Sequence, residues 1–308
     1  MDNYKLIERL GRIVRYLRDQ PGISKNLILE KLAENEQETI TLRTLERDFK
    51  SLRERFFLEI IYDRSRNGYS LDADFDKEVN ELLHFTELCQ LGSILNTGFN
   101  DFKAFSALVQ LDQSSAFQGI ELIKPTLLAI QQRQKIHFTH INYWEETQKS
   151  YTITPLMIKE YLKRWYVIGV PEGKNEIRTF GMDRVKTLEI GNPSSIKHRD
   201  FSAQLDQFHK IVGLNFNDGD GKIKEIKLRV HANHIKYLSG LPLHHSQRID
   251  YTTGEPHGTV TYQVIINYEF KVEILKMGNL AEVISPPKLR DAIKKMLEET
   301  LELYFNTA

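Results

Sequence analysis

The chain has 308 residues, and its 42 basic side chains are balanced by 42 acidic ones. This length predicts two or three domains, and the lack of net charge means that any contact with nucleic acid requires a local basic face. The single cysteine, Cys89, excludes an internal disulfide and fits the reducing cytoplasm. No apolar run approaches the ~20 residues of a membrane span. The first residues lack the layout of an export signal, so we expect no membrane partner.

Residues 1–72 have the pattern of three short helices followed by a hairpin. Apolar residues recur at helical spacing from Leu6 to Leu17, and Ser24 and Thr41 are suited to cap the second and third helices. Asn67-Gly68 between two apolar segments predicts the hairpin. This order is the layout of a winged helix-turn-helix domain.

The polar face of the third predicted helix and the tip of the hairpin hold the candidate DNA contacts. Such side chains reach base edges or phosphate oxygens when a helix lies in the major groove. A charged face is often only a solvated one, and basic and acidic residues nearly balance in this segment. Both interpretations stay open for the DNA-binding candidates, which are Arg43, Thr44, Arg47, Lys50, Arg64 and Arg66.

Residues 73–134 predict a helical linker. Apolar residues at helical spacing run from Val79 to Leu95, a further helix is expected around residues 102–111, and Pro125 suits the first turn of another. Helices this apolar form either a dimer surface or a contact with their own domain. We expect a homodimer, although packing within one chain explains the pattern equally well.

Residues 135–200 predict five short strands that close into a small barrel. Alternation along a strand places Trp165 and Tyr166 on opposite faces, whereas Arg178 and Phe180 share one face. Aromatic rings beside arginines can stack a base and neutralise an anion. The plainer interpretation is that the aromatic rings fill the core and the arginines form a solvated rim.

A longer set of residues in this region carries a family resemblance. The set comprises Pro155, Lys159-Glu160-Tyr161, Arg164-Trp165-Tyr166-Val167-Ile168-Gly169, Arg178, Phe180, Asp183 and Arg184. It resembles the WYL domain of bacterial transcriptional regulators, with Val167 in place of the leucine of the Trp-Tyr-Leu triplet. Thr154 and His140 stand where many members have histidine and tyrosine.

The resemblance implies an SH3-like or Sm-like barrel that senses a nucleotide or a nucleic-acid-derived oligonucleotide. The ligand-binding residues that we expect on this basis are His140, Lys159, Tyr161, Trp165, Tyr166, Arg178 and Arg184.

Residues 201–308 alternate between strand and helix patterns, which predicts a ferredoxin-like α+β module. Its closing helix is expected to bury Leu289, Ile293, either Met296 or Leu297, Leu301 and Tyr304. The run Val283–Arg290 resembles the C-terminal extension that accompanies WYL domains, and this resemblance implies roles in dimerisation and in the response to ligand.

The chain has none of the common catalytic or metal-binding motifs. There is no P-loop, dinucleotide-binding turn or nucleophile elbow, and Asn217–Gly221 and His244-His245 lack the spacing of calcium and zinc sites. We therefore expect no cofactor, no metal and no enzymatic activity.

The sequence predicts a ligand-responsive transcriptional regulator that binds operator DNA as a homodimer. Its α+β organisation comprises a winged helix-turn-helix domain (1–72), a helical linker (73–134), an SH3/Sm-like β-barrel (135–200) and a ferredoxin-like extension (201–308). One alternative is a nucleic-acid-processing enzyme or accessory subunit that holds single strands in the barrel. Another is a scaffold whose basic helix contacts protein.

Overall fold

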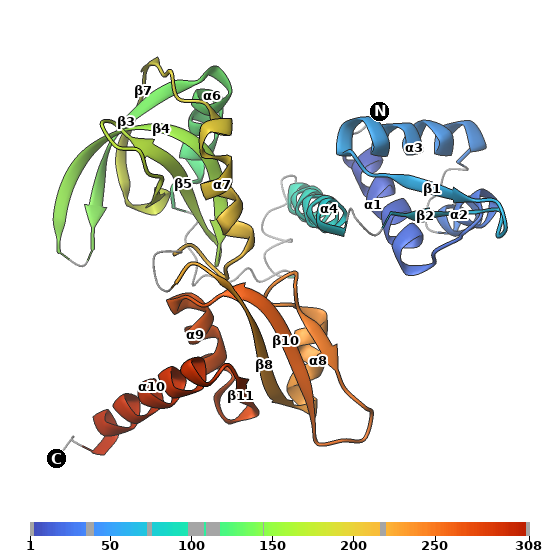
Figure 1. Cartoon of the computed structure of the whole chain (residues 1–308). Helices are drawn as coiled ribbons and strands as arrows, with labels where there is room; N and C mark the ends of the chain where they lie inside the picture. The colour runs from blue at the N-terminus through green and yellow to red at the C-terminus, as the bar shows by residue number, and fades with distance from the viewer. Residues whose placement is uncertain are drawn as a thin grey trace. The chain divides into compact units, whose positions relative to one another are not determined.

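A computed structural model describes residues 3–34, 40–72, 76–97, 108, 118–143, 145–215 and 220–305. The chain divides into two compact units, unit 1 (residues 1–112) and unit 2 (residues 113–308) (Figure 1). Unit 1 is helical with one two-stranded sheet, and unit 2 contains a five-stranded and a four-stranded sheet, which makes the chain mixed α+β. Among the helices described, none combines the length and apolar character that crossing a membrane requires.

Unit 1 places three helices before a hairpin and a fourth helix after it. The hydroxyl oxygens of Ser24 and Thr41 accept hydrogen bonds from the backbone N–H groups of Leu27 and Thr44, so both predicted caps are confirmed. The elements are α1 (Asn3–Asp19), α2 (Lys25–Ala33), α3 (Leu42–Phe56), β1 (Ile60–Asp63), β2 (Gly68–Leu71) and α4 (Asp76–Thr97).

The hairpin is attached to the turn between α1 and α2. The backbone N–H of Gly22 donates to the carbonyl of Tyr69 at 3.0 Å, and the N–H of Tyr69 donates to the carbonyl of Ile23 at 2.8 Å. A Cβ atom on Gly68 would lie 1.8 Å from the carbonyl oxygen of Gly22, so this approach requires glycine. The hairpin is thereby fixed relative to the three helices.

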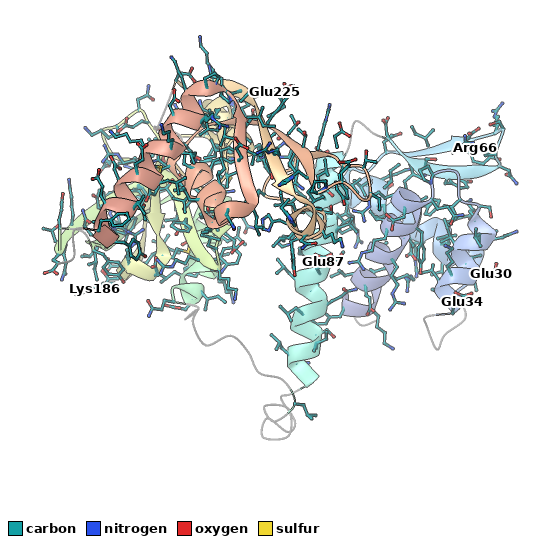
Figure 2. All side chains as sticks on the ribbon, turned by 90° about the horizontal axis from the view of Figure 1, so that it is seen from below. Glu30, Glu34, Arg66, Glu87, Lys186 and Glu225 are labelled. Atoms are coloured by element: carbon teal, nitrogen blue, oxygen red, sulfur yellow. The ribbon has the colours of Figure 1, made fainter. Side chains whose placement is uncertain are left out.

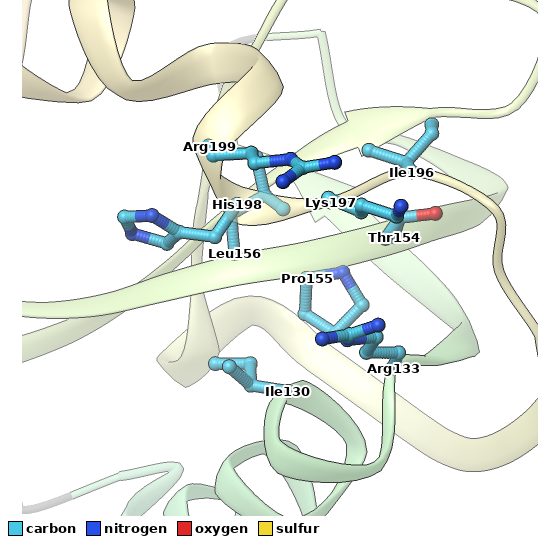
Figure 3. A pocket seen from close by; sticks show the side chains of 9 residues that line it. All are labelled: Ile130, Arg133, Thr154, Pro155, Leu156, Ile196, Lys197, His198 and Arg199. Atoms are coloured by element: carbon cyan, nitrogen blue, oxygen red, sulfur yellow. The ribbon is translucent and has the colours of Figure 1, made fainter.

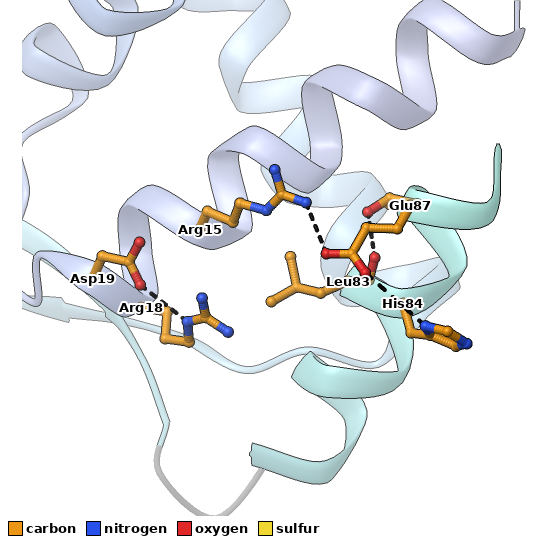
Figure 4. Close-up of polar contacts among 7 residues, drawn as sticks. Arg15, Arg18, Asp19, Leu83, His84 and Glu87 are labelled. Atoms are coloured by element: carbon orange, nitrogen blue, oxygen red, sulfur yellow. Dashed lines mark hydrogen bonds and ion pairs between the residues drawn. The ribbon is translucent and has the colours of Figure 1, made fainter. Parts of the chain in front are cut away.

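The helix α4 packs against α1 at a similarly close contact. A Cβ atom added to Gly11 would lie 2.7 Å from the hydroxyl oxygen of Thr86, and Val79, Leu82 and Leu83 join the core of unit 1. At the edge of this contact Arg15 donates to the carboxylate of Glu87 at 3.0 Å (Figure 4). Beyond Leu83 the helix turns apolar side chains to solvent.

In unit 2 a five-stranded antiparallel sheet has the strand order β6-β5-β4-β3-β7. Among the described residues β6 does not pair with β7, so the closed barrel expected from the sequence is not found and the sheet keeps two edges. The four-residue β6 ends in a short 3-10 turn (η3), after which β7 pairs with β3. The elements are η2 (Ile120–Leu122), α6 (Ile123–Gln132), β3 (Gln134–Asn142), β4 (Thr147–Tyr161), β5 (Arg164–Pro171), β6 (Arg178–Gly181), η3 (Met182–Arg184) and β7 (Val185–Pro193).

The two faces of this sheet are buried in different cores. On one face Val167 packs with Phe138, Phe180 and Ala129 of α6. On the other face Ile168 joins a cluster with residues of a helical segment that follows β7. That segment comprises η4 (His198–Phe201), α7 (Ser202–Leu205) and η5 (Asp206–His209).

The rest of unit 2 is a β-α-β-β-α-β arrangement with the sheet order β11-β8-β10-β9. Alternate residues of β8 and β10 are buried, and they pack with residues of three helices in one core. The elements are β8 (Ile223–His231), α8 (Ala232–Gly240), β9 (Arg248–Asp250), β10 (His257–Ile265), α9 (Tyr268–Lys276), η6 (Gly278–Leu280), β11 (Ala281–Ser285) and α10 (Pro287–Phe305).

Leu289 and Ile293 of α10 are buried, but Leu301 and Tyr304 are 54% and 79% exposed, so the prediction of a buried stripe along the whole helix was wrong. The helix expected around residues 102–111 lies outside the described residues, apart from Leu108.

Candidate functional site

The first candidate surface is the polar face of α3. Arg43 and Arg47 are exposed, and neither forms an ion pair within the described part of the chain. Lys50 lies 3.7 Å from the carboxylate of Glu54, and the hydroxyl of Thr44 lies 3.0 Å from that of Thr41. The helix α3 therefore presents three exposed cationic side chains and one hydroxyl group, which are the four DNA contacts predicted on it.

The loop of the hairpin carries the other two predicted DNA contacts. Arg64 and Arg66 are both exposed, and Figure 2 shows Arg66 at the tip of the hairpin. The carboxylate of Asp63 accepts hydrogen bonds from the N–H and hydroxyl of Ser65, which lower the pKa of Asp63. Asp63 therefore organises the loop, while its ion pair with Arg66 is long, at 3.8 Å, and exposed.

A buried ion pair fixes the orientation of α3. The guanidinium of Arg9 on α1 donates to both carboxylate oxygens of Asp48, at 2.7 and 3.1 Å, and the two residues are only 7% and 0% exposed. Because Arg47 precedes Asp48, the ion pair holds the helix face that bears the exposed arginines.

The second candidate site is a cavity of about 900 Å³ in unit 2. It lies at the open edge of the five-stranded sheet and is bounded on another side by the segment that follows β7. His140, Arg178 and Arg184, three of the seven predicted ligand-binding residues, line it together. The other lining residues are Asn142, Tyr151, Glu176, Ile177, Thr179, Phe180, Gln204, Gln207, Leu214 and Asn215.

Aromatic rings surround His140 in this cavity. The ring centroids of Phe180 and Tyr151 lie 5.6 and 6.4 Å from that of His140, and 4.9 Å from each other. Burial, and then the nearby guanidinium of Arg184, lower the pKa of His140 below its ordinary value of 6.5. At neutral pH the imidazole is uncharged.

Two polar atoms on the cavity residues are buried without a hydrogen-bond partner in the described structure. They are Nε2 of His140 and Nε of Arg184. The carboxylate of Asp183, whose side chain is 9% exposed, lies 3.7 Å from Nε of Arg184 and 3.5 Å from Arg164, which is too far for a hydrogen bond. Buried polar groups are ordinarily paired, so these atoms indicate a place for a ligand.

Arg178 is more exposed than Arg184, and its ion pair with Glu176 lies at the surface. Its guanidinium donates to the carboxylate of Glu176 at 2.8 Å, but both side chains are largely exposed. An exposed ion pair of this kind contributes only about 0–1 kcal/mol. An anionic ligand could therefore displace Glu176 at little cost.

The structure places the other four predicted ligand-binding residues away from this cavity. Trp165 packs against the core cluster of Val167 and Phe180, as the plainer interpretation expected. Lys159 and Tyr166 are directly paired across β4 and β5, so they project from the opposite face to Trp165, which confirms the predicted alternation.

These polar residues meet α9 and η5 on that opposite face. Burial lowers the pKa of Lys159, whose ammonium lies 5.9 Å from the centroid of the Phe208 ring. Burial, together with the carboxylates of Glu273 and Glu269, raises the pKa of Tyr161 to about 12. Their surroundings are those of a packed contact rather than of an open cavity.

The sequence reasoning missed several residues of the cavity wall. Tyr151 pairs directly with Phe138 across β3 and β4, and the alternation of those strands carried a signal for it. Gln204 and Gln207 belong to short helical turns for which the sequence offers no periodic pattern. Within the described residues no group of three or more His, Cys, Asp or Glu could hold a metal ion.

Comparison with known families identifies two domains in this chain. The WYL domain family model matches residues 121–190, and the WCX domain family model matches residues 223–301. The first match contains β3 to β6, most of β7 and most of the residues that line the large cavity, and the second contains the β-α-β-β-α-β arrangement. No curated protein matches the chain.

Two solved structures are similar over nearly the whole chain. One is proteasome accessory factor B/C (PafBC) of Arthrobacter aurescens, at 17% identity and a TM-score of 0.29, with 94% of this chain and 46% of that chain covered. The other is a CRISPR Cas-related protein, at 13% identity and a TM-score of 0.39, with 98% and 85% covered. The chain thus spans about half the length of the first of these structures.

Proposed function

We propose that this chain, which contains a WYL domain and a WCX domain, is a ligand-responsive transcriptional regulator without enzymatic activity. In this proposal unit 1 is a winged helix-turn-helix domain in which α3 enters the major groove and the β1–β2 loop contacts the phosphate backbone. The observation that carries DNA binding is the exposed arginine face of α3, held in place by the buried ion pair of Arg9 and Asp48.

The ligand of unit 2 is proposed to be a nucleotide or a short single-stranded nucleic acid. Such a ligand presents a planar base and an anionic phosphate, which match the aromatic rings of Tyr151 and Phe180 and the guanidinium groups of Arg178 and Arg184. Nε2 of His140 and Nε of Arg184, which make no hydrogen bond in the described structure, support this assignment. A bound acceptor would satisfy Nε of Arg184, and a hydrogen-bonding group of the ligand would satisfy His140.

The functional form is proposed to be a homodimer that binds a pseudo-palindromic operator. The second half of α4 exposes Leu88, Leu91, Ile94 and Leu95, which makes an apolar surface suited to a second copy of the chain. In unit 2 the strand order β11-β8-β10-β9 supports a ferredoxin-like assignment for the WCX region. A dimer would be converted to monomer by Leu91→Glu, as measured by analytical ultracentrifugation.

Selection of bound fragments from random duplex DNA by the full chain tests this function. We expect enrichment of one two-fold-symmetric sequence, bound with an affinity that falls steeply with salt because phosphate contacts release counterions. Failure to enrich any sequence, or binding that is insensitive to salt, would contradict the proposal. Cleavage of labelled DNA in the presence of a divalent metal would instead favour a nucleic-acid-processing enzyme.

A further inference from the structure

Unit 2 contains a second, smaller cavity of about 270 Å³, which lies where the end of α6 meets β4 and residues 196–199 (Figure 3). None of its lining residues lines the large cavity. The two cavities are therefore separate candidate sites.

Three cationic side chains and no acidic side chain line the smaller cavity. Arg133, Lys197 and Arg199 contribute the positive charges, and no aspartate or glutamate lines the cavity. The carboxylate of Asp200 lies 3.9 Å from Nε of Arg199, and both side chains are well exposed. Arg133 and Lys197 form no ion pair within the described part of the chain. Three like charges around one concave surface favour an anion between them.

Hydrogen bonds fix the backbone that carries these cations. Arg133 is the C-cap of α6 with φ 54°, and its carbonyl accepts from the N–H of Ser194 at 2.7 Å. The hydroxyl of Ser194 lies 2.6 Å from that of Thr154, a residue of β4 that is 4% exposed, and it also accepts from the N–H of Ile196. The walls of the cavity are therefore held before any ligand binds, which lowers the cost of binding.

The floor of the cavity is apolar, and its size restricts the occupant. Ile130, Pro155 and Leu156 supply the apolar contacts. Ligand pockets commonly measure about 300–1,000 Å³, so this cavity is slightly smaller than that range. It accommodates one compact group rather than an oligonucleotide.

Interaction with the end of a long helix explains only one of the cations. Arg133 stands at the C-terminal end of α6, where a positive charge interacts favourably with the helix dipole. Lys197 and Arg199 belong to the segment after β7 and end no helix of comparable length. Figure 3 shows that the imidazole of His198 points away from the guanidinium groups of Arg133 and Arg199, so three cations remain to face an anion.

We propose that this cavity binds a phosphate group, carried either by inorganic phosphate or by a mononucleotide. Guanidinium forks and an ammonium are the side chains that best recognise phosphate oxygens. Residues 196–199 continue directly into α7 and η5, whose Gln204 and Gln207 line the large cavity. A phosphate held here would therefore fix the segment that forms part of the larger site.

Isothermal titration of the full chain with inorganic phosphate tests the proposal. The double variant Arg133→Asn/Lys197→Gln removes two charges, and asparagine tolerates the positive φ at residue 133. We expect saturable binding by the unmodified chain and a loss of affinity of about tenfold or more in the double variant, since charge-assisted hydrogen bonds are lost. A parallel titration with adenosine monophosphate, alone and after saturation with phosphate, identifies the source of the group: competition favours a mononucleotide, and the absence of competition favours free phosphate.

The matched control is Arg248→Asn/Lys186→Gln, which removes the same charge from exposed residues outside both cavities. The control is expected to bind phosphate as tightly as the unmodified chain. An equal loss of phosphate affinity in the two double variants would show that the effect comes from net charge alone, and it would overturn the proposal. Saturable binding that survives in Arg133→Asn/Lys197→Gln, or no saturable binding by the unmodified chain, would also overturn it.

Discussion

Arg9 on α1 and Asp48 on α3 form a bidentate ion pair that is almost completely buried, with nitrogen–oxygen distances of 2.7 and 3.1 Å. Parallel hydrogen bonds of this kind are among the strongest that side chains make. The pair joins the first helix to the helix proposed to read DNA. Its loss would leave a buried charge without compensation.

We expect Asp48→Ala to destabilise unit 1 by about 3–5 kcal/mol, the cost of breaking a buried ion pair. Hydrogen exchange of the amides in α1 and α3 of the full chain measures this loss locally. The control is Asp19→Ala, which breaks the exposed pair with Arg18 and should change stability by no more than about 1 kcal/mol. Equal effects of the two variants would show that the buried pair is not the element that fixes α3.

The contact between Gly22 and Gly68 makes a second prediction. Gly68→Ala would place a methyl group 1.8 Å from the carbonyl oxygen of Gly22, so the hairpin must move away from the α1–α2 turn. We expect destabilisation of about 1–3 kcal/mol, as for overpacked sites, with faster exchange of the Tyr69 amide. Gly92→Ala, whose added methyl would meet no neighbour, is the control and should not raise exchange at Tyr69.

DNA binding gives a third prediction, at Arg47. If its guanidinium holds a base, Arg47→Ala should weaken binding to the selected duplex by ~1–3 kcal/mol and relax the sequence preference at one position. Fluorescence anisotropy measures the affinity. Lys5→Ala, which removes an exposed charge from α1, serves as the charge control. An Arg47→Ala variant that binds the selected duplex as tightly as the unmodified chain would remove Arg47 from the interface.

The stability of unit 2 should depend on pH through His244. Its Nε2 lies 2.9 Å from the carbonyl of His209, and its Nδ1 accepts from the N–H of Ser246, so the neutral ring satisfies both contacts. Burial, together with the neighbouring His245, lowers the pKa of His244 from 6.5 to about 4. The unfolded chain therefore binds a proton more readily than the folded chain between these two values.

It follows that stability is fully present above pH 6.5 and is lost as the pH falls toward 4, by about 3 kcal/mol in total. Urea unfolding of the full chain at several pH values measures this dependence. His244→Gln should flatten the curve over the same window. An unchanged slope in that variant would assign the dependence to other groups.

The sequence was most informative where the determinant is local. The helix caps at Ser24 and Thr41 and the hairpin turn after Asp63 depend on neighbouring residues. Each of them was predicted correctly. The opposite orientation of Trp165 and Tyr166 follows from strand geometry alone. The exposure of Arg64 and Arg66 was predictable because both lie on the loop of the hairpin.

Contacts between distant residues could not be predicted in this way. The sequence does not distinguish Asp48 from the other polar residues of α3, because its partner on α1 is 39 positions away. Closure of the sheet depends on whether β6 reaches β7, which strand patterns do not determine. Gln204 and Gln207 line the large cavity and come from a segment without periodicity, so the sequence did not predict this wall. The ligand site was expected beside Trp165, whereas the cavity lies beside His140.

The central claim is that an occupant of the large cavity changes the affinity of unit 1 for DNA. Its most direct test is the affinity for the selected duplex, measured with and without a short single-stranded oligonucleotide, in Arg184→Gln and in the control Lys186→Gln. We predict that the oligonucleotide shifts the affinity of the unmodified chain and of Lys186→Gln, and leaves that of Arg184→Gln unchanged. The same shift in all three proteins, or no shift in the unmodified chain, would contradict the claim.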